Sequence, residues 1–268
     1  MKQFLLDKEP DRDNTVRLKC ADYRYLVRVR RLAVGEFFPA LLPGGEETLV
    51  QVLSVDHSVL TGKLVPKSPA RSCEGIIPVP QSPLPPIVLF QALPKSDKMD
   101  LIARQAAEGG ITEIVPFVSE YSFIKVNAAE QKLSRWERII REARQQSGSK
   151  TATAIRPPLT MIGLLDYWKK ISETGALGLL FHHEGLANKS LHSYLDSIPQ
   201  TVALAIGPEG GFSDTEVSLF LENGFNSITI GDTILRTETA ALYCAAAVRV
   251  LLLERNSWEL KQAKTGRV

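Results

Sequence analysis

The sequence predicts an α/β protein in two parts, a small β-rich domain followed by a larger domain built on a parallel sheet. Three observations lead to this prediction. Short apolar runs of alternating polarity fill residues 1–70, proline and serine are frequent in 65–86, and strand-like and helix-like patterns alternate from Ile87 onward. Such alternation is typical of parallel sheets, because a helix usually carries the chain back before the next parallel strand begins.

The first part has the spacing of a small barrel. The sequence predicts its strands at 16–18, 37–42, 48–54 and 58–64, with turns at 43–45 and 56–57. The proline-rich segment that follows has no helical period and indicates a semi-rigid linker. We therefore place the domain boundary near residue 72, which gives domains of residues 1–71 and 72–268.

The second part alternates regularly. Strands are predicted at 87–92, 111–117, 153–155, 176–181, 202–206 and 226–230, and helices at 96–109, 129–147, 160–173, 188–197, 214–223 and 238–254. Residues 255–268 form a polar tail that we expect to fray. From connectivity alone we expect an ordinary open sheet, since knotted chains are rare.

Composition and charge narrow the class of protein. The chain has 268 residues, of which 44% are hydrophobic and 23% charged, as in an ordinary globular protein. We expect a cytoplasmic protein without a membrane partner, because no apolar stretch approaches a membrane span and the amino terminus lacks a signal-peptide core. Cys20, Cys73 and Cys244 are widely spaced, which indicates a reducing compartment and neither a disulfide framework nor a metal site.

Two glycine-containing loops form the candidate site. Residues 207–211 follow the apolar run Val202 to Ile206, and residues 231–239 follow the run Ile228 to Ile230. Ligands of open α/β sheets bind beyond the carboxyl ends of such strands. We therefore expect the two loops to form two walls of one pocket.

The first loop favours a cationic or amino ligand. Gly210 and Gly211 allow close approach of a ligand, and Ser213 with Glu216 forms a capping box that begins the next helix. No phosphate-binding glycine motif is present, and Glu209 places a carboxylate where a phosphate would be repelled. The alternative is a tight strand-to-helix turn that binds nothing.

The two loops also carry a family resemblance. The motifs GPEGGFSDTE at 207–216 and ILRTETAAL at 234–242 closely resemble those of the bacterial 16S ribosomal RNA uridine-N3 methyltransferases, which belong to the SPOUT class. Residues 89–120, Trp136, residues 146–148 and the segment Tyr25 to Gly35 extend the resemblance over nearly the whole chain. It implies a carboxyl-terminal parallel sheet with a deep trefoil knot, preceded by a PUA-like RNA-binding barrel.

The resemblance implies S-adenosyl-L-methionine as the cofactor, 16S ribosomal RNA in the 30S subunit as the substrate, and a homodimer. It also implies a third loop at the cofactor pocket, which contains Glu184 at the acidic position of the family. The cofactor residues implied are Phe181, Glu184, Ile206, Gly207, Glu209, Gly210, Gly211, Ile230, Gly231, Ile234, Leu235, Arg236, Thr239 and Ala240. We do not expect a metal at His182-His183-Glu184, since the spacing does not suit a ligand set.

Three residues are candidates for the chemistry. Arg236 cannot act as a base, but it can stabilise negative charge on the uracil carbonyl oxygens; alternatively it ties its loop to Glu209 or Glu238. The two glutamates are weaker candidates for accepting the N3 proton, and water is a further candidate.

A basic segment, Tyr23 to Arg31, is the candidate RNA contact. Its residues Arg24, Arg28, Arg30 and Arg31 can hold phosphates, and its two tyrosines can stack on unpaired bases. The alternative is a solvated edge of the barrel. The helix at 129–147 carries a second basic stripe, for which a solvated face and an RNA-facing surface remain open.

Four positions depart from the family pattern. Tyr25 replaces a histidine, Tyr121 an arginine, Gln145 an acid and Ser149 an arginine. Two other functions remain open at this point: a non-catalytic RNA-binding protein whose α/β domain only dimerises, and an enzyme of the same fold that acts on tRNA or on a ribose 2′-hydroxyl.

Overall fold

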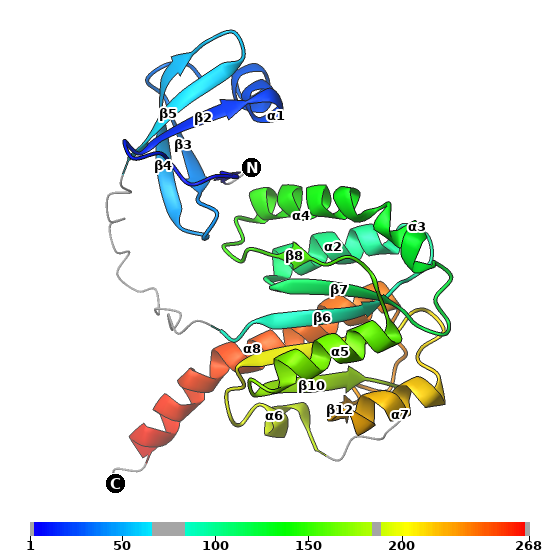
Figure 1. Ribbon diagram of the computed structural model, residues 1–268. Helices are drawn as coiled ribbons and strands as arrows, with labels where there is room; N and C mark the ends of the chain where they lie inside the picture. The colour runs from blue at the N-terminus through cyan, green and yellow to red at the C-terminus, as the bar shows by residue number, and fades with distance from the viewer. Residues whose placement is uncertain (1–2, 66–83, 184–188, 266–268) are drawn as a thin grey trace. The chain divides into compact units, whose positions relative to one another are not determined.

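The computed structural model describes residues 3–65, 84–183 and 189–265, with side chains in the last helix described as far as residue 254 (Figure 1). It divides into two compact units. The first comprises Met1–Ile76 with Arg144–Ala152, and the second comprises Ile77–Ala143 with Thr153–Val268. The domain boundary predicted near residue 72 lies outside the described residues.

The first unit contains a five-stranded mixed sheet in the order β1-β3-β4-β5-β2. Its strands are β1 Phe4–Leu5, β2 Thr15–Lys19, β3 Phe37–Leu41, β4 Glu47–Val55 and β5 Val59–Val65. The β1–β3 pair is parallel and the other pairs are antiparallel. Fully buried side chains such as Phe38 and Leu60 pack on its inner face. The strands predicted in this region are confirmed.

The basic segment is helical. Cys20–Tyr23 forms α1 and Arg24–Val29 forms a π-helix. Leu26 is fully buried, and Tyr23, Tyr25 and Val27 pack against the same apolar core. The helical form turns Leu26 into the core while Arg24 and Arg28 remain exposed. The two tyrosines are half-buried against this core, and their role as base-stacking rings stays a prediction.

The second unit contains a parallel sheet in the order β12-β10-β11-β6-β7-β8, with β9 paired to β7. The strands are β6 Ile87–Ala92, β7 Glu113–Val118, β8 Ala154–Ile155, β9 Leu159–Thr160, β10 Ala176–Phe181, β11 Thr201–Ile206 and β12 Phe225–Ile228. Every pair in this sheet is parallel. The carboxyl ends of its strands therefore lie along one edge.

Helices cover both faces of this sheet (Figure 1). One face carries α2 (Lys98–Gly109) and α8 (Thr237–Thr265), with α4 (Leu133–Ser147) outside them. The other carries α5 (Met161–Ser172) and α7 (Asp214–Glu222). The two short helices are α3 (Val126–Glu130) and α6 (Leu191–Tyr194).

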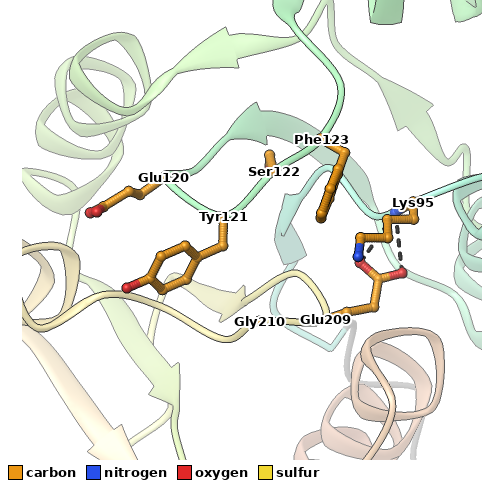
Figure 2. Close-up of a pocket in the computed structure, with 7 residues that line it drawn as sticks. All are labelled: Lys95, Glu120, Tyr121, Ser122, Phe123, Glu209 and Gly210. Atoms are coloured by element: carbon orange, nitrogen blue, oxygen red, sulfur yellow. Dashed lines mark hydrogen bonds between the residues drawn. The ribbon is translucent and has the colours of Figure 1, made fainter.

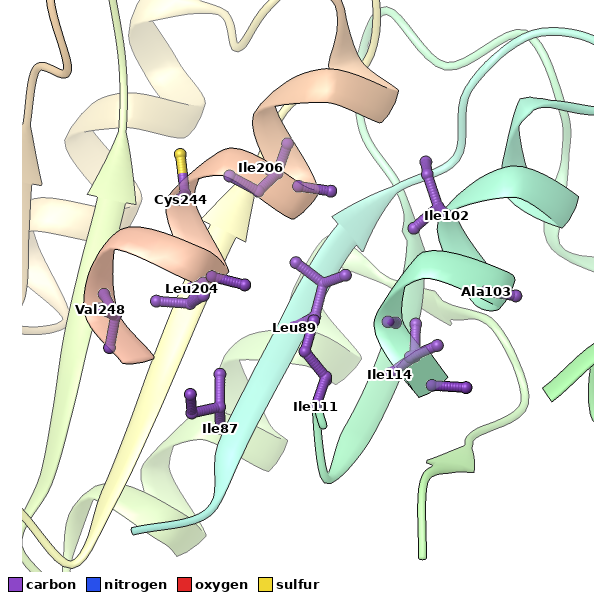
Figure 3. Close-up of a cluster of buried hydrophobic side chains, with 14 of the residues drawn as sticks. Ile87, Leu89, Ile102, Ala103, Ile111, Ile114, Leu204, Ile206, Cys244 and Val248 are labelled. Carbon is purple, nitrogen blue, oxygen red and sulfur yellow. The ribbon is translucent and has the colours of Figure 1, made fainter. Parts of the chain in front are cut away.

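The helix α8, which begins beside the candidate site, packs against one face of the sheet. Its buried residues Ala241, Cys244, Ala245 and Val248 follow the helical spacing and pack on Leu204 of β11 (Figure 3). Fully burying one aliphatic side chain contributes about 1.5–3 kcal/mol, so this face holds α8 firmly against the strands.

Several predicted bounds differ from the structure. The strand predicted at 226–230 ends at Ile228, and the helix predicted at 188–197 is only the short α6. The tail expected to fray continues α8 as far as Thr265, because glutamate, lysine, glutamine and alanine favour a helix. Among the described residues, none of the helices is long and apolar enough to cross a membrane.

Candidate functional site

The candidate site lies where three neighbouring strands end. In the sheet order, β10 lies between β11 and β12. Phe181 at the end of β10 pairs with Ile228 at the end of β12, and Ile206 ends β11 beside them. The structure therefore places the end of β10 between the ends of the two strands that precede the glycine loops. The predicted cofactor residue Glu184, in the loop after β10, lies outside the described residues.

One buried hydroxyl joins these loops to the strand next to them. Thr237, at the start of α8, donates its Oγ1 hydrogen to the carbonyl of Gly207 at 2.6 Å. The same Oγ1 accepts a hydrogen bond from Nε2 of Gln91 at 3.0 Å, and Nε2 also donates to the Ala92 carbonyl. Gln91 is fully buried and Thr237 is 4% exposed. The network ties the end of β6, the loop after β11 and the first turn of α8 together.

Sequence reasoning missed Thr237 and Gln91. The signal for Gln91 was a single amide within the otherwise apolar strand β6. A buried amide requires hydrogen-bond partners, so its position near the carboxyl end of a strand marks a polar site there.

A lysine that sequence reasoning also missed holds the two candidate glutamates. Nζ of Lys98 lies 2.9 Å from Oε1 of Glu209 and 3.3 Å from Oε2 of Glu238. The backbone N–H of Lys95 also donates to the Glu209 carboxylate, at 3.1 and 3.2 Å (Figure 2). Neither glutamate pairs with Arg236 in the part of the chain that the structure describes, which disagrees with the alternative role of Arg236 as a tether.

These contacts set the ionisation of Glu209 and Lys98. Burial opposes ionisation of the Glu209 carboxyl, but the hydrogen bonds from Lys98 and from backbone N–H groups outweigh it, so the pKa of Glu209 is lowered. The hydrogen bond to Glu209 raises the pKa of Lys98 against the effect of burial. Both groups are therefore charged at neutral pH, and Glu209 is a weak proton acceptor.

Arg236 lies at the start of α8 with its side chain exposed. Its carbonyl accepts hydrogen bonds from the backbone N–H groups of Thr239 and Ala240, at 2.9 and 2.8 Å. The backbone at Arg236 is thereby fixed, while the guanidinium forms no ion pair within the described ranges. The five donors of this guanidinium remain available to a ligand.

The glycines of the two loops differ in what surrounds them. Gly211 has φ +73° and Gly231 has φ +74°, and a Cβ added at either would meet no atom within 4 Å. Only glycine adopts such a backbone readily, and both positions face open space. A Cβ at Gly210 would instead lie 3.1 Å from Cβ of Tyr121. Gly210 therefore allows Tyr121 to approach, whereas the expectation was approach of a ligand.

The remaining predicted cofactor residues differ in how far their side chains are exposed to solvent. Ile206 is buried, and Phe181, Gly207, Ile230, Leu235 and Ala240 are half-buried. Ile234 and Thr239 are exposed. Apolar side chains beside two unhindered glycines fit a nucleoside that is held partly by backbone groups.

A cavity of about 590 Å³ lies beside Gly210 (Figure 2). The loop after β7, which contains Tyr121 and Phe123, forms one wall, and Lys95 with Glu209 forms another. Glu216 holds these loops together. Its Oε1 accepts from the N–H of Glu120 at 2.8 Å, and its Oε2 accepts from Ser213 in the capping box predicted from the sequence, which is confirmed.

Comparisons with a family model and with individual proteins point to the same family. Residues 80–249 match a family model described as an RNA methyltransferase domain. The chain is 33% identical over 240 residues to the Ribosomal RNA small subunit methyltransferase E of Synechocystis sp., which covers 89% of this chain and 74% of the relative. It is 30% identical over 261 residues to the Ribosomal RNA small subunit methyltransferase E 2 of Borreliella burgdorferi, with coverage of 96% and 100%.

Solved structures agree with this result. A Ribosomal RNA small subunit methyltransferase E from Neisseria gonorrhoeae, bound to S-adenosyl methionine, has a TM-score of 0.78 at 26% identity and covers 94% of this chain and 98% of that one. A methyltransferase from Legionella pneumophila in complex with the same cofactor has a TM-score of 0.76 at 25% identity, with coverage of 93% and 97%.

We expect Thr237→Val to damage this edge of the sheet. The substitution keeps the shape of the side chain but leaves Gln91 and the Gly207 carbonyl without their shared partner. The free energy of unfolding, measured with urea, should fall by about 1–3 kcal/mol. Thr215→Val, on the exposed side of α7, is the matched control and should change stability by less than about 0.5 kcal/mol. Equal effects of the two substitutions would contradict the importance of the network.

Proposed function

The chain belongs to the RNA methyltransferase family, and from that premise we propose that it transfers the methyl group of S-adenosyl-L-methionine to N3 of a uridine in 16S ribosomal RNA. The observation that carries the proposal is the pair of unhindered glycines, Gly211 and Gly231, on loops that follow β11 and β12, the two strands on either side of β10 in the matched domain. The names of the relatives support the ribosomal substrate. The motifs at 207–216 and 234–242 support N3 of uridine as the acceptor.

The cofactor is held, in this proposal, between the loops after β10, β11 and β12. When bound, S-adenosyl-L-methionine supplies a methyl group already activated by its sulfonium. Ile206, Ile230 and Leu235 offer apolar contact, and the loops at Gly211 and Gly231 admit the ligand close to the backbone. The Thr237 hydroxyl keeps the Gly207 carbonyl in place at the same edge.

The chain then has to present N3 as a nucleophile. N3 of uracil carries a proton at neutral pH, and removing it costs about 1.4 kcal/mol for each unit by which its pKa exceeds the pH. We assign Arg236 to the stabilisation of negative charge on the uracil carbonyl oxygens, because its guanidinium is exposed and unpaired among the described residues. Lys98 pairs with both Glu209 and Glu238, and the lowered pKa of Glu209 makes it a weak base, so we assign the proton to water.

The first unit is assigned to RNA binding as a PUA-like barrel. Arg24, Arg28 and Arg31 are exposed on its helical segment and Arg30 is half-buried, so this segment presents positive charge for phosphates. For the second unit we propose the deep trefoil knot of the SPOUT class. The target is 16S rRNA within the 30S subunit, which places the reaction in the cytoplasm.

We also propose a homodimer. The helix α8 exposes Leu242 at 38%, Tyr243 at 52% and Val250 at 48%, and Ile234 just before it is 83% exposed. A second copy of the chain would remove these apolar groups from water. Sedimentation equilibrium at micromolar concentration should show twice the mass of the chain, and a single species at the monomer mass would contradict the proposal.

The function is tested by a methylation assay with labelled cofactor. We expect transfer to 30S subunits, and mass spectrometry of the digested RNA should identify 3-methyluridine. Free 16S rRNA, tRNA and a mock reaction without enzyme are the comparison samples. A product methylated on a ribose 2′-hydroxyl or on tRNA would favour another activity of this fold, and binding of RNA without transfer would favour a non-catalytic protein.

We expect Arg236→Ala to lower the single-turnover rate by about a hundredfold. The deficit should shrink as the pH rises from about 7 to about 10, because the uridine anion then forms without help. Cofactor affinity, measured by calorimetry, should stay within about threefold. Arg236→Lys should recover part of the rate, and Arg104→Ala on the exposed side of α2 is the control. A deficit that is constant across the pH range would contradict the electrostatic role.

A further inference from the structure

The cavity beside Gly210 has two exposed aromatic rings on its wall. Phe123 is 70% exposed and Tyr121 is 45% exposed, and both belong to the loop that follows β7. Leaving a phenylalanine exposed gives up about 1.5–3 kcal/mol of the free energy that burial would contribute. Such a ring at the mouth of a cavity therefore marks a surface that a ligand covers. The tyrosines of the first unit, in contrast, already pack against its core.

The two rings are held differently. The Tyr121 side chain lies against Gly210, where a Cβ would come 3.1 Å from Cβ of Tyr121 and 3.3 Å from its Cγ. This contact makes Tyr121 a fixed wall of the cavity. Phe123 meets Nζ of Lys95, which lies 3.6 Å from the centroid of its ring (Figure 2). The ammonium group lies over one face of this ring. Because the side chain is 70% exposed, the other face is open to a flat ligand.

The charged side chains that line the cavity are Lys95, Glu120 and Glu209. Lys95 and its neighbour Phe123 are exposed, so the ammonium group can leave the ring and hold an anion. The Glu209 carboxylate forms an ion pair with Lys98, which also pairs with Glu238. Stacking on one side and a mobile cation on the other are the usual elements of a site for unpaired nucleotides.

We propose that this cavity receives an unpaired pyrimidine nucleotide of the RNA substrate, with its base stacked on Phe123 and its phosphate held by Lys95. The inference rests on the proposed function, and it places the substrate base against Glu209 and Gly210 of the loop after β11. An enzyme that acts on a base must take that base out of the helical stack, and it needs a platform that replaces the lost stacking. The volume of about 590 Å³ is ample for one nucleotide.

The first test separates aromatic stacking from apolar bulk. Phe123→Ala and Phe123→Leu should raise the concentration of 30S subunits that gives half the maximal single-turnover rate by about tenfold, since base–aromatic stacking contributes about 1–3 kcal/mol. Phe123→Trp should stay within about threefold of wild type. Affinity for S-adenosyl-L-methionine should be unchanged in all three variants. Phe37→Ala, on an exposed phenylalanine of β3, is the matched control.

The second test does not depend on turnover. Ribosomal RNA containing 5-iodouridine is bound to the wild-type protein and irradiated, and the cross-linked peptide is identified by mass spectrometry. We expect the cross-link on Phe123 or Tyr121, and its loss in Phe123→Ala.

The outcomes distinguish this inference from the proposed function. If wild-type protein methylates 30S subunits but Phe123→Ala keeps the wild-type half-saturation and the cross-link lies elsewhere, the base site is wrong and the function stands. If wild-type protein methylates no ribosomal RNA, the proposed function fails. A cross-link at residues 121–123 in that case would still support the base site. If RNA does not bind in the cavity and a protein binds there instead, the inference is overturned.

Discussion

The site depends on one buried hydrogen-bonded group, the hydroxyl of Thr237. It donates to the Gly207 carbonyl and accepts from Gln91, so it joins three segments that are far apart in sequence. A buried polar group without partners costs about 1–3 kcal/mol, so the three partners hold one another in place. The parallel sheet brings the strand ends to a common edge, and the Thr237 hydroxyl fixes how the loop after β11 meets the start of α8.

The glycines of the loop at 207–211 have different surroundings. On the side of Gly211 and Gly231, no atom would meet an added Cβ, which suits a nucleoside cofactor. On the side of Gly210, Tyr121 packs closely and Phe123 stays exposed, which suits a base brought from outside. Lys98 pairs with both Glu209 and Glu238, and the electrostatic task in our account falls to Arg236.

The sequence was sufficient for most of the architecture and for part of the site. Alternation of strands and helices predicted the parallel sheet, and Ser213 with Glu216 predicted the start of α7, because both signals are local. Thr237 and Gln91 could not be paired in advance, since 146 residues separate them and the contact follows from the strand order. The sequence showed the arginines of the segment Tyr23 to Arg31 but not its helical form, which follows from the packing of Leu26 and its neighbours on the core.

The central claim is that the cofactor binds between the loops after β10, β11 and β12 and not in the cavity beside Phe123. Hydrogen–deuterium exchange with and without S-adenosyl-L-methionine tests it directly, because it locates protection along the whole chain. Our account predicts slower exchange in the backbone amides of 207–213 and 229–240 and no change at 119–123. Protection confined to 119–123, or protection absent from both glycine loops at saturating cofactor, would contradict it.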